Sequence, residues 1–463
     1  MPFLKQAGCK GCPAEFKGQY MTPDDNKPGS RVRVVAQSPG ESEILGRRFV
    51  RWYKGEEGTG EIWEADIPRP LIGKSGYALD NTFLPLAGLK REDVEVCNVV
   101  RCRLNNSNDL PPLTTNMARD MTTHCQRAYW REPTNGTTLV ALGAYALWAL
   151  TGEYEGDDDD ADSAEDDLRA SKSIDGWRGW LLPYKPVHHE GYEGNPRELN
   201  VFATYHPAFY WRAHWLKPVG KMDFARLGRL LRGTWPEAFP TMFQYAPVNL
   251  PPTIAFDTEY NPWTKELHRY SVAWRTGEDL PVVHVCEPND VIKEYNNNVI
   301  IMQNAEADWP YLTSIFGSLP ETWDDTMFAH SALYGTLRHS LDFMGSLYAK
   351  HNRWKHLQHS DPLVYSGMDA LATYDIWQQL SRELTRDSLS LALYEQELKP
   401  LLPHVMARPS VRLNAMHIAE AAQELAQEQE GIAKRGEAVA GWPLNVSSAA
   451  QVSRWLRLKS DPQ

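Results

Sequence analysis

The chain has 463 residues, more than a single hydrophobic core usually organises, so two or three domains are expected. Its formal net charge is −12, but residues 153–167 alone carry ten acidic side chains and the rest of the chain is close to neutral. The overall sign therefore does not exclude a nucleic-acid partner. No apolar run approaches the roughly 20 residues of a membrane span, and the N-terminus lacks a signal-peptide core, which predicts a cytoplasmic protein without a membrane partner.

Strand-like and helical segments alternate over residues 1–235. The β-branched run 31–36 leads into a Pro-Gly turn, and 94–100 is a second strand. Residues 137–150 indicate a strand that turns into a helix, and 199–204 indicate a strand before a His-Pro turn. This alternation predicts an α/β domain with a mostly parallel sheet, in which ligands bind beyond the carboxyl ends of the strands.

The rest of the chain divides by composition. The acidic run 153–170 is predicted to be a disordered loop inside the first domain, because it cannot bury apolar area. Proline-rich residues 236–251 are predicted to be a linker. A second α/β domain follows over 252–390, and 391–463 are predicted to be mainly helical.

The cysteines are unevenly placed. Cys9 and Cys12 form a C-x2-C pair, and Cys102 and Cys125 follow far downstream. A core role suits Cys97, inside an apolar strand, but not the polar, glycine-rich GCKGCP segment around the pair. Disulfides are not expected in a cytosolic chain. The spacing therefore predicts a metal centre, either structural zinc or an iron–sulfur cluster, whose ligands can be scattered in sequence.

Polar and aromatic side chains gather after the predicted strands. Gln37 and Glu43 flank the first turn, Asn98 ends the second strand, and His206 follows a later one. Phe49 lies beside two arginines in GRRFV. Each residue alone has a structural explanation: a core ring, a turn cap or a satisfied histidine. Their joint placement at strand ends predicts a binding site.

Seven motifs in order make this region recognisable: GCKGCP, VVAQSPGESE, GRRFV, GKSGYALD, CNVVRCR, VALGAYAL and TYHPA. Over about residues 5–232 the chain resembles the iron–sulfur uracil-DNA glycosylases. The resemblance implies that a [4Fe–4S] cluster is held by Cys9, Cys12, Cys102 and Cys125.

The same resemblance implies roles at the strand ends. Asn98 would pair with the uracil edge and Phe49 would stack on the flipped base. His206 would stabilise charge on the uracil O2, and Glu43 would orient or activate water. The family usually has Glu where this chain has Gln37, which can position water but cannot act as a base. Residues 51–71 are an insertion. The domain is thus expected either to excise uracil or only to recognise it.

Carboxylates dominate the second domain. Asp257 and Glu259 project from the same side of a strand, since side chains alternate at period two. Asp308 follows in QNAEAD, and Tyr365 and Asp369 are four apart on one helix face. Converging carboxylates need a cation, and oxygen ligands suit Mg²⁺ or Mn²⁺. Two such ions are the usual device for hydrolysing phosphodiesters.

The order D-x-E, N-x3-D, Y-x3-D resembles the 3′–5′ proofreading exonuclease domain of family A DNA polymerases, a ribonuclease H-like fold. The resemblance implies that Asp257, Glu259, Asp308 and Asp369 ligate the two ions. Tyr365 would orient the attacking water, and the substrates would be single-stranded and primer–template DNA. Residues 441–456, GWPLNVSSAAQVSRWL, resemble the start of a polymerase domain.

These resemblances predict a replication protein that proofreads DNA and excises or senses uracil. The polymerase part would lie in a longer chain or in a separate subunit. A glycosylase-like module ahead of a proofreading domain is phage-like by analogy, which would place the protein in the host cytoplasm. The alternative is a non-catalytic DNA-binding and assembly subunit of a split family A polymerase.

Overall fold

A computed structural model describes residues 7–15, 18–55, 58–104, 110, 115–134, 136–152, 174–187, 199–292, 298–406, 415–442, 444–445, 451–452 and 455. The predicted acidic loop, 153–170, lies outside the described residues. Residues 1–402 form one compact unit and residues 403–463 a second. Among the described helices, none is both long enough and apolar enough to span a bilayer.

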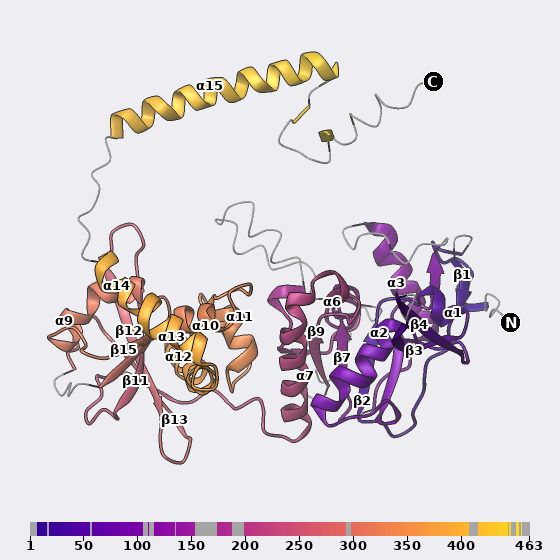
Figure 1. Ribbon diagram of the computed structural model, residues 1–463, viewed down its shortest axis with the longest axis horizontal. Coiled ribbons are helices and arrows are strands. Elements are labelled where there is room, and N and C mark those ends of the chain that lie inside the picture. Colours follow the sequence, from indigo (N-terminus) through magenta and orange to yellow (C-terminus); the bar gives the residue numbers. More distant parts are fainter. Residues whose placement is uncertain are drawn as a thin grey trace. The chain divides into compact units, whose positions relative to one another are not determined.

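The first predicted domain, residues 1–235, is called the front domain, and the second, residues 252–390, the middle domain. The front domain is built on a five-stranded sheet (Figure 1). Its strands, in spatial order, are β5 (Val94–Asn98), β2 (Val32–Ala36), β7 (Thr138–Leu142), β9 (Asn200–Thr204) and β8 (Leu181–Pro183). The first four are parallel and β8 is antiparallel to β9. The β-branched residues that predicted these strands are buried on both faces, as expected for parallel strands covered by helices.

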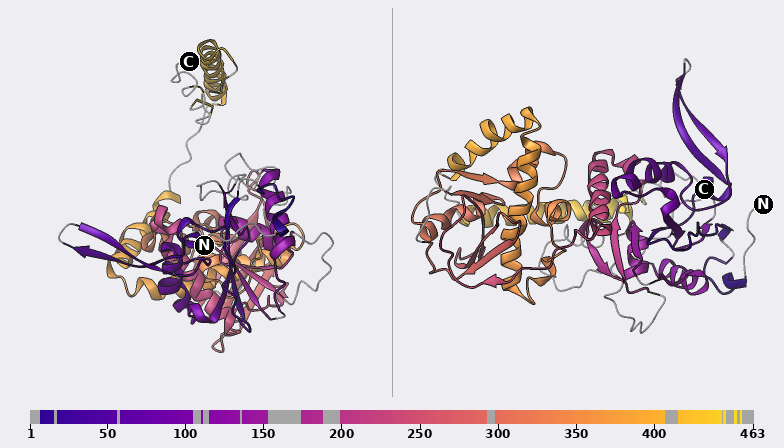
Figure 2. Two further views of the ribbon diagram at one scale, coloured as in Figure 1. Left: turned by 90° about the vertical axis from the view of Figure 1, so that its right-hand side faces the viewer. Right: turned by 90° about the horizontal axis from the view of Figure 1, so that it is seen from below.

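Helices and two small antiparallel pairs complete this domain. The helices are α1 (Glu41–Ile44), α2 (Lys74–Ala78), α3 (Asn116–Tyr129), α4 (Ala144–Thr151), α6 (Phe209–Arg212) and α7 (Lys217–Leu231). The pairs are β1 (Gly18–Met21) with β6 (Cys102–Leu104), and β3 (Arg47–Gly55) with β4 (Gly58–Ala65). The β3–β4 hairpin, which contains much of the predicted insertion, projects from the domain (Figure 2, right).

The middle domain contains a mixed six-stranded sheet. Its strands, in spatial order, are β10 (Met242–Phe243), β13 (Pro281–Cys286), β12 (Leu267–Arg275), β11 (Thr253–Tyr260), β14 (Val299–Met302) and β15 (Trp323–Asp325). The helices are α8 (Ala305–Asp308), α9 (Leu312–Phe316), α10 (Thr326–Leu333), α11 (Leu341–Tyr348), α12 (Pro362–Leu384), α13 (Ser388–Ala392) and α14 (Lys399–Met406). Part of the predicted linker 236–251 belongs to this sheet, because β10 pairs with β13.

Helix α12 is the central helix of the middle domain. Asp361 caps its first turn by accepting a hydrogen bond from the Val364 amide, and Pro362 occupies the first helical position. The helix packs across β11, β12 and β13, and Asp369 faces β11, which carries Asp257 and Glu259. The predicted α/β fold class, with a helical C-terminal segment that includes α15 (Ala415–Ala440), is confirmed.

Candidate functional site

Three of the four predicted carboxylates of the middle domain converge. Asp257 and Glu259 from β11 and Asp369 from α12 place carboxylate oxygens within 4.8 Å of one another. Burial, together with the neighbouring carboxylates, raises the pKa of Asp257 well above its usual range and that of Glu259 to about 7. Such a cluster is short of positive charge, and its hard oxygen donors fit Mg²⁺ or Mn²⁺.

Asp308 lies next to this cluster rather than within it. Its Oδ1 accepts hydrogen bonds from the backbone amide of Thr258, at 2.9 Å, and from the Thr258 hydroxyl, at 2.6 Å. Burial raises the pKa of Asp308 to about 8, and the charge of Glu259 contributes to this rise. Thr258, between the two acidic residues of the D-x-E motif, therefore holds the fourth carboxylate in place.

Two contacts of Asp369 were missed by sequence reasoning. Lys355 Nζ donates to both Asp369 oxygens at 2.8 Å and to the Tyr365 hydroxyl at 3.2 Å. The indole N–H of Trp354 donates to Asp369 Oδ1 at 2.5 Å. Both residues lie in the stretch HNRWKHL before α12, where Trp354 precedes a single 3₁₀ turn, Lys355–Leu357, and no periodicity marks the segment. Asp325, by contrast, serves as the N-cap of α10.

Three residues of the predicted uracil site, Gln37, Asn98 and His206, lie at or just after the carboxyl ends of β2, β5 and β9. Asn98 ends β5 and is 3% exposed, yet in the described part of the chain neither side-chain amide atom has a hydrogen-bond partner of normal geometry. The Glu43 carboxylate accepts from the Gly40 amide and lies close enough to Asn98 for that amide to lower its pKa slightly. Burial prevails and raises the pKa of Glu43 to about 7.

His206 and Gln37 occupy the other predicted strand ends. His206 Nδ1 accepts a hydrogen bond from the Ala208 amide at 3.1 Å, which leaves the proton of the neutral ring on Nε2. Burial lowers the pKa of His206 to about 4, so the ring is neutral at pH 7. Gln37 follows β2, and its backbone carbonyl oxygen accepts a hydrogen bond from the Val100 amide at 3.0 Å.

Phe49 is covered by other aromatic side chains. It is 3% exposed, and its ring centroid lies 4.4 Å from that of Trp52, 5.1 Å from that of Trp63 and 5.3 Å from that of Tyr77. Trp52 and Trp63 come from the insertion 51–71. The role of Phe49 in stacking on a base stays a prediction, and it requires this cluster to open.

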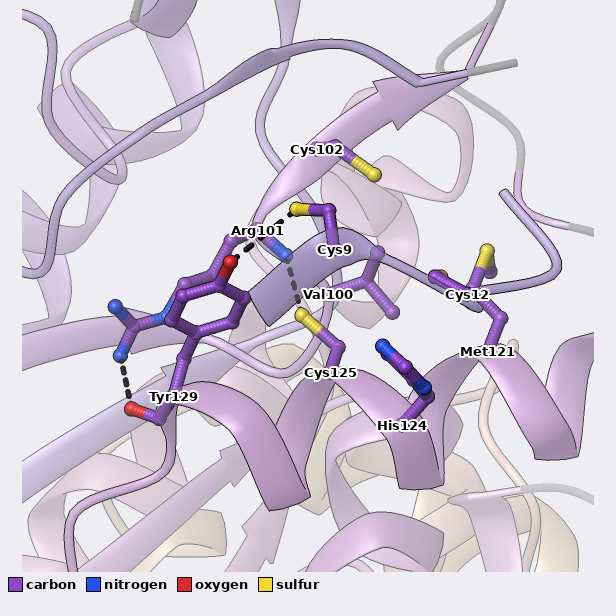
Figure 3. A pocket seen from close by; sticks show the side chains of 9 residues that line it. All are labelled: Cys9, Cys12, Val100, Arg101, Cys102, Met121, His124, Cys125 and Tyr129. Carbon is purple, nitrogen blue, oxygen red and sulfur yellow. Dashed lines mark hydrogen bonds between the residues drawn. The ribbon is translucent and has the colours of Figure 1, made fainter. Parts of the chain in front are cut away.

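The four predicted metal-binding cysteines line one pocket (Figure 3). Cys9 and Cys12 come from the N-terminal segment, Cys102 from β6 and Cys125 from α3. The backbone amides of Ala14 and Arg101 point at the sulfurs of Cys12 and Cys125, each at 3.4 Å. Burial raises the pKa of Cys125 to about 12, so a thiolate there needs a positive centre. The donor set fits a thiolate-ligated metal or cluster.

Comparison with known proteins covers both domains. A family described as the uracil DNA glycosylase superfamily matches residues 23–223, and a family described as 3′–5′ exonuclease matches residues 238–385. The chain is similar to the type-4 uracil-DNA glycosylase of Thermotoga maritima, with 29% identity over 141 residues, 30% of this chain and 58% of that one. It is also similar to the type-4 uracil-DNA glycosylase of Sulfurisphaera tokodaii, with 23% identity over 227 residues, 48% of this chain and 80% of that one.

The T. maritima match thus spans less than two thirds of that protein. Among solved structures, Brucella melitensis NrnC with bound Mg²⁺ is 18% identical with a TM-score of 0.28, covering 38% of this chain and 98% of that one. Escherichia coli RNase D is 18% identical with a TM-score of 0.29, and the match covers 34% of this chain and 46% of that one. The chain combines a domain of the uracil DNA glycosylase superfamily with a 3′–5′ exonuclease domain.

Proposed function

We propose that the middle domain removes nucleotides from the 3′ end of DNA by metal-dependent hydrolysis. The convergence of Asp257, Glu259 and Asp369 within 4.8 Å carries this proposal. These three residues would hold the divalent ions, with Asp308 beside them as the ligand or support for a second ion. Bound ions would neutralise the scissile phosphate and lower the pKa of an attacking water.

The chain's own side chains have two further tasks. The Tyr365 hydroxyl, one helical turn before Asp369, would orient the attacking water. Lys355 fixes that hydroxyl at 3.2 Å and at the same time holds Asp369. This arrangement supports in-line attack on a terminal phosphodiester, because the side chains that would orient the water and hold the ions are fixed before substrate arrives.

The test is degradation of a 3′-labelled single-stranded oligonucleotide with and without Mg²⁺. Asp257→Ala is expected to abolish degradation, whereas Glu306→Gln is the matched control. Glu306 is an exposed acid on α8, two residues from Asp308. Loss of activity only in Asp257→Ala supports the proposal, and an unchanged rate in that variant refutes it.

A second activity, excision of uracil, is supported by the buried side-chain amide of Asn98, which makes no hydrogen bond of normal geometry in the described part of the chain and lies beside the Glu43 carboxylate. Burying a polar group without a hydrogen-bond partner costs about 1–3 kcal/mol, which suits a ligand-binding position. The amide can donate to uracil O4 and accept from N3–H. Neutral His206 would donate from Nε2 to the developing charge on O2, and Glu43 would activate water that Gln37 helps to position.

This activity is tested in EDTA, which silences the nuclease, on an oligonucleotide that carries one uracil. Alkali then cleaves any abasic site. A cut at uracil that is lost in Asn98→Ala supports excision. Protein that binds the uracil oligonucleotide without cutting it would show recognition alone.

We also propose that Cys9, Cys12, Cys102 and Cys125 hold a [4Fe–4S] cluster that fastens the N-terminal segment to α3 and β6. Two contacts already join this segment to α3: His124 Nε2 lies 2.9 Å from the Gly8 carbonyl oxygen, and the Cys9 sulfur lies 3.2 Å from the Tyr129 hydroxyl. A brown protein with about four irons per chain is expected. A colourless, zinc-loaded protein purified from anaerobic cells would refute the cluster.

The wider role we propose is proofreading and uracil surveillance during DNA replication, with primer–template DNA and the catalytic part of a family A polymerase as partners. The match of residues 238–385 to an exonuclease family supports it. Co-purification with a polymerase that gains fidelity from this chain is the test. If both catalytic assays are negative while DNA binding persists, the chain is instead a non-catalytic assembly subunit.

A further inference from the structure

The two domains share an interface that reaches the exonuclease site. Segment 349–355 runs from the end of α11 to the residues that contact Asp369, and front-domain side chains contact both α11 and this segment. In Figure 1, α7 of the front domain lies beside α11. One cluster of buried hydrophobic residues contains members of both domains, among them Trp180 and Phe224 of the front domain and Met344 and Trp354 of the middle domain.

At the start of the segment, Arg226 of α7 caps α11. Its fully buried guanidinium donates to the carbonyl oxygens of Gly345, at 3.1 Å, and also of Ser346 and Ala349. The Gly345 carbonyl also accepts from the Ala349 amide at 3.0 Å, whereas the carbonyls at the very end of a helix lack partners within the helix, so Arg226 supplies donors to the last turn of α11. Cation–π contacts with Trp180 and Trp235, at 4.8 Å and 4.4 Å from the ring centroids, hold the guanidinium in place.

In the middle of the segment, Asn352 pairs with the front-domain sheet. Its Oδ1 accepts from the Leu181 amide at 3.1 Å, and its Nδ2 donates to the Leu181 carbonyl at 2.9 Å. The guanidinium of Arg353 lies 4.5 Å from the ring centroid of Trp177. A side-chain amide that makes both bonds to one backbone residue fixes the segment against β8.

At the end of the segment, Trp180 packs edge-to-face on Trp354, with ring centroids 5.9 Å apart and both rings fully buried. Trp354 in turn donates to Asp369, and Lys355 bonds both oxygens of the same carboxylate. A continuous series of contacts therefore joins Trp180 of the front domain to a carboxylate of the exonuclease site.

We propose that the front domain is a structural part of the exonuclease site, because it fixes segment 349–355 and through it the position of Asp369. This inference rests on the proposed exonuclease function. Trp354 and Asn352 are positioning residues. Groups that orient a metal ligand from outside are commonly worth about 10- to 100-fold in metal affinity or activity.

Three variants of the full chain test the proposal. Asn352→Ala removes both bonds to Leu181, Trp180→Leu removes the ring that supports Trp354, and Trp354→Phe removes only the N–H that contacts Asp369. The matched control is Arg338→Ala, which removes a more exposed ion pair between the domains, Arg338 to Asp175 at 3.4 Å. That pair lies outside segment 349–355.

Two quantities are measured: Mn²⁺ affinity without DNA, by electron paramagnetic resonance, and kcat and KM on a single-stranded oligonucleotide. We expect Asn352→Ala and Trp354→Phe to lower Mn²⁺ affinity or kcat about 10- to 100-fold with KM for DNA unchanged, and Arg338→Ala to match wild type. If Trp180→Leu does not fold, Asn352→Ala tests the front-domain contact alone.

The proposal is overturned if Asn352→Ala and Trp354→Phe match Arg338→Ala in both Mn²⁺ affinity and kcat. Failure of the exonuclease function is distinguishable from this result. Wild-type protein that binds Mn²⁺ but does not degrade DNA would refute the function, while the Mn²⁺ affinities of the variants would still decide whether the front domain positions Asp369.

Discussion

Lys355 Nζ donates hydrogen bonds to both carboxylate oxygens of Asp369, each at 2.8 Å, and Asp369 belongs to the carboxylate cluster of the proposed metal site. Asp369 is 5% exposed, so its charge depends on nearby cations rather than on water. Lys355 and a bound divalent ion would therefore both neutralise the Asp369 carboxylate. Removing the lysine should make the stability of the fold depend more strongly on the ion.

Lys355→Met is expected to lower the thermal unfolding midpoint in EDTA, because it leaves a buried carboxylate without a cation. Breaking a buried ion pair costs on the order of 3 kcal/mol. Mn²⁺ should raise the midpoint more in this variant than in wild type. Lys399→Met is the matched control, since Lys399 pairs with Asp324 at 2.9 Å away from the site. An equal Mn²⁺ shift in both variants would contradict the expectation.

The pH dependence of the uracil-excision rate should follow the ionisation of the Glu43 carboxyl. Because burial raises the pKa of Glu43 from 4.5 to about 7, the base form appears only as the pH rises through about 7, and the excision rate should rise with it. Glu43→Gln is expected to remove this rise of the rate with pH. Glu41→Gln, an exposed neighbour on α1, should keep it. The measurement is the rate in EDTA between pH 5 and 9, and a wild-type rate that does not vary with pH would exclude Glu43 as the base.

The same pKa shift has a consequence for stability. The folded protein favours protonated Glu43, so this contribution is complete below pH 4.5 and is lost as the pH rises through about 7. Glu43→Gln should therefore flatten the decline of the unfolding midpoint between pH 4.5 and 7. Glu41→Gln serves again as the comparison. An unchanged slope in Glu43→Gln would show that the carboxyl is not buried as described.

Substitution of a cysteine that lines the pocket should lower the iron content of the protein, whereas substitution of a cysteine outside the pocket should not. Cys12→Ser removes one of the four thiols that line the pocket, whereas Cys97→Ser changes a buried thiol in β5 that is not among the pocket-lining residues. We expect the first variant to lose most of its iron and visible absorbance and the second to keep both. Equal iron loss in the two variants would indicate a folding defect rather than loss of a ligand.

Much of both sites could be predicted from local patterns. The strand period placed Asp257 and Glu259 together, the helical spacing placed Tyr365 with Asp369, and strand ends located Asn98 and His206. Each of these inferences needs only the geometry of one element and the rule that ligands gather at the carboxyl ends of parallel strands. The C-x2-C pair likewise predicts a metal centre, and Cys102 and Cys125 line the same pocket as that pair.

The contacts between elements could not be predicted. Trp354 and Lys355 lie at the start of one short 3₁₀ turn, where no period relates them to Asp369. Arg226 is a charged side chain buried between two domains, which composition alone would place at the surface. The aromatic contacts of Phe49 also depend on the pairing of β3 with β4, which places Trp63 of the insertion opposite Phe49.

The buried pair of Arg178 and Asp223 should reveal how strongly the front domain depends on its own buried charges. Their side chains are fully buried and joined at 2.9 Å, and Thr204 Oγ1 donates to Asp223 at 2.8 Å. Arg178→Met would leave the carboxylate without its cation and should destabilise the fold by about 3–5 kcal/mol. The double variant Arg178→Met/Asp223→Leu should be less destabilised than the Arg178→Met single variant, because no lone charge remains. The coupling is measured from the unfolding midpoints of wild type, Arg178→Met, Asp223→Leu and the double variant. If the destabilisations of the two single variants simply add in the double variant, the pair does not act as a unit.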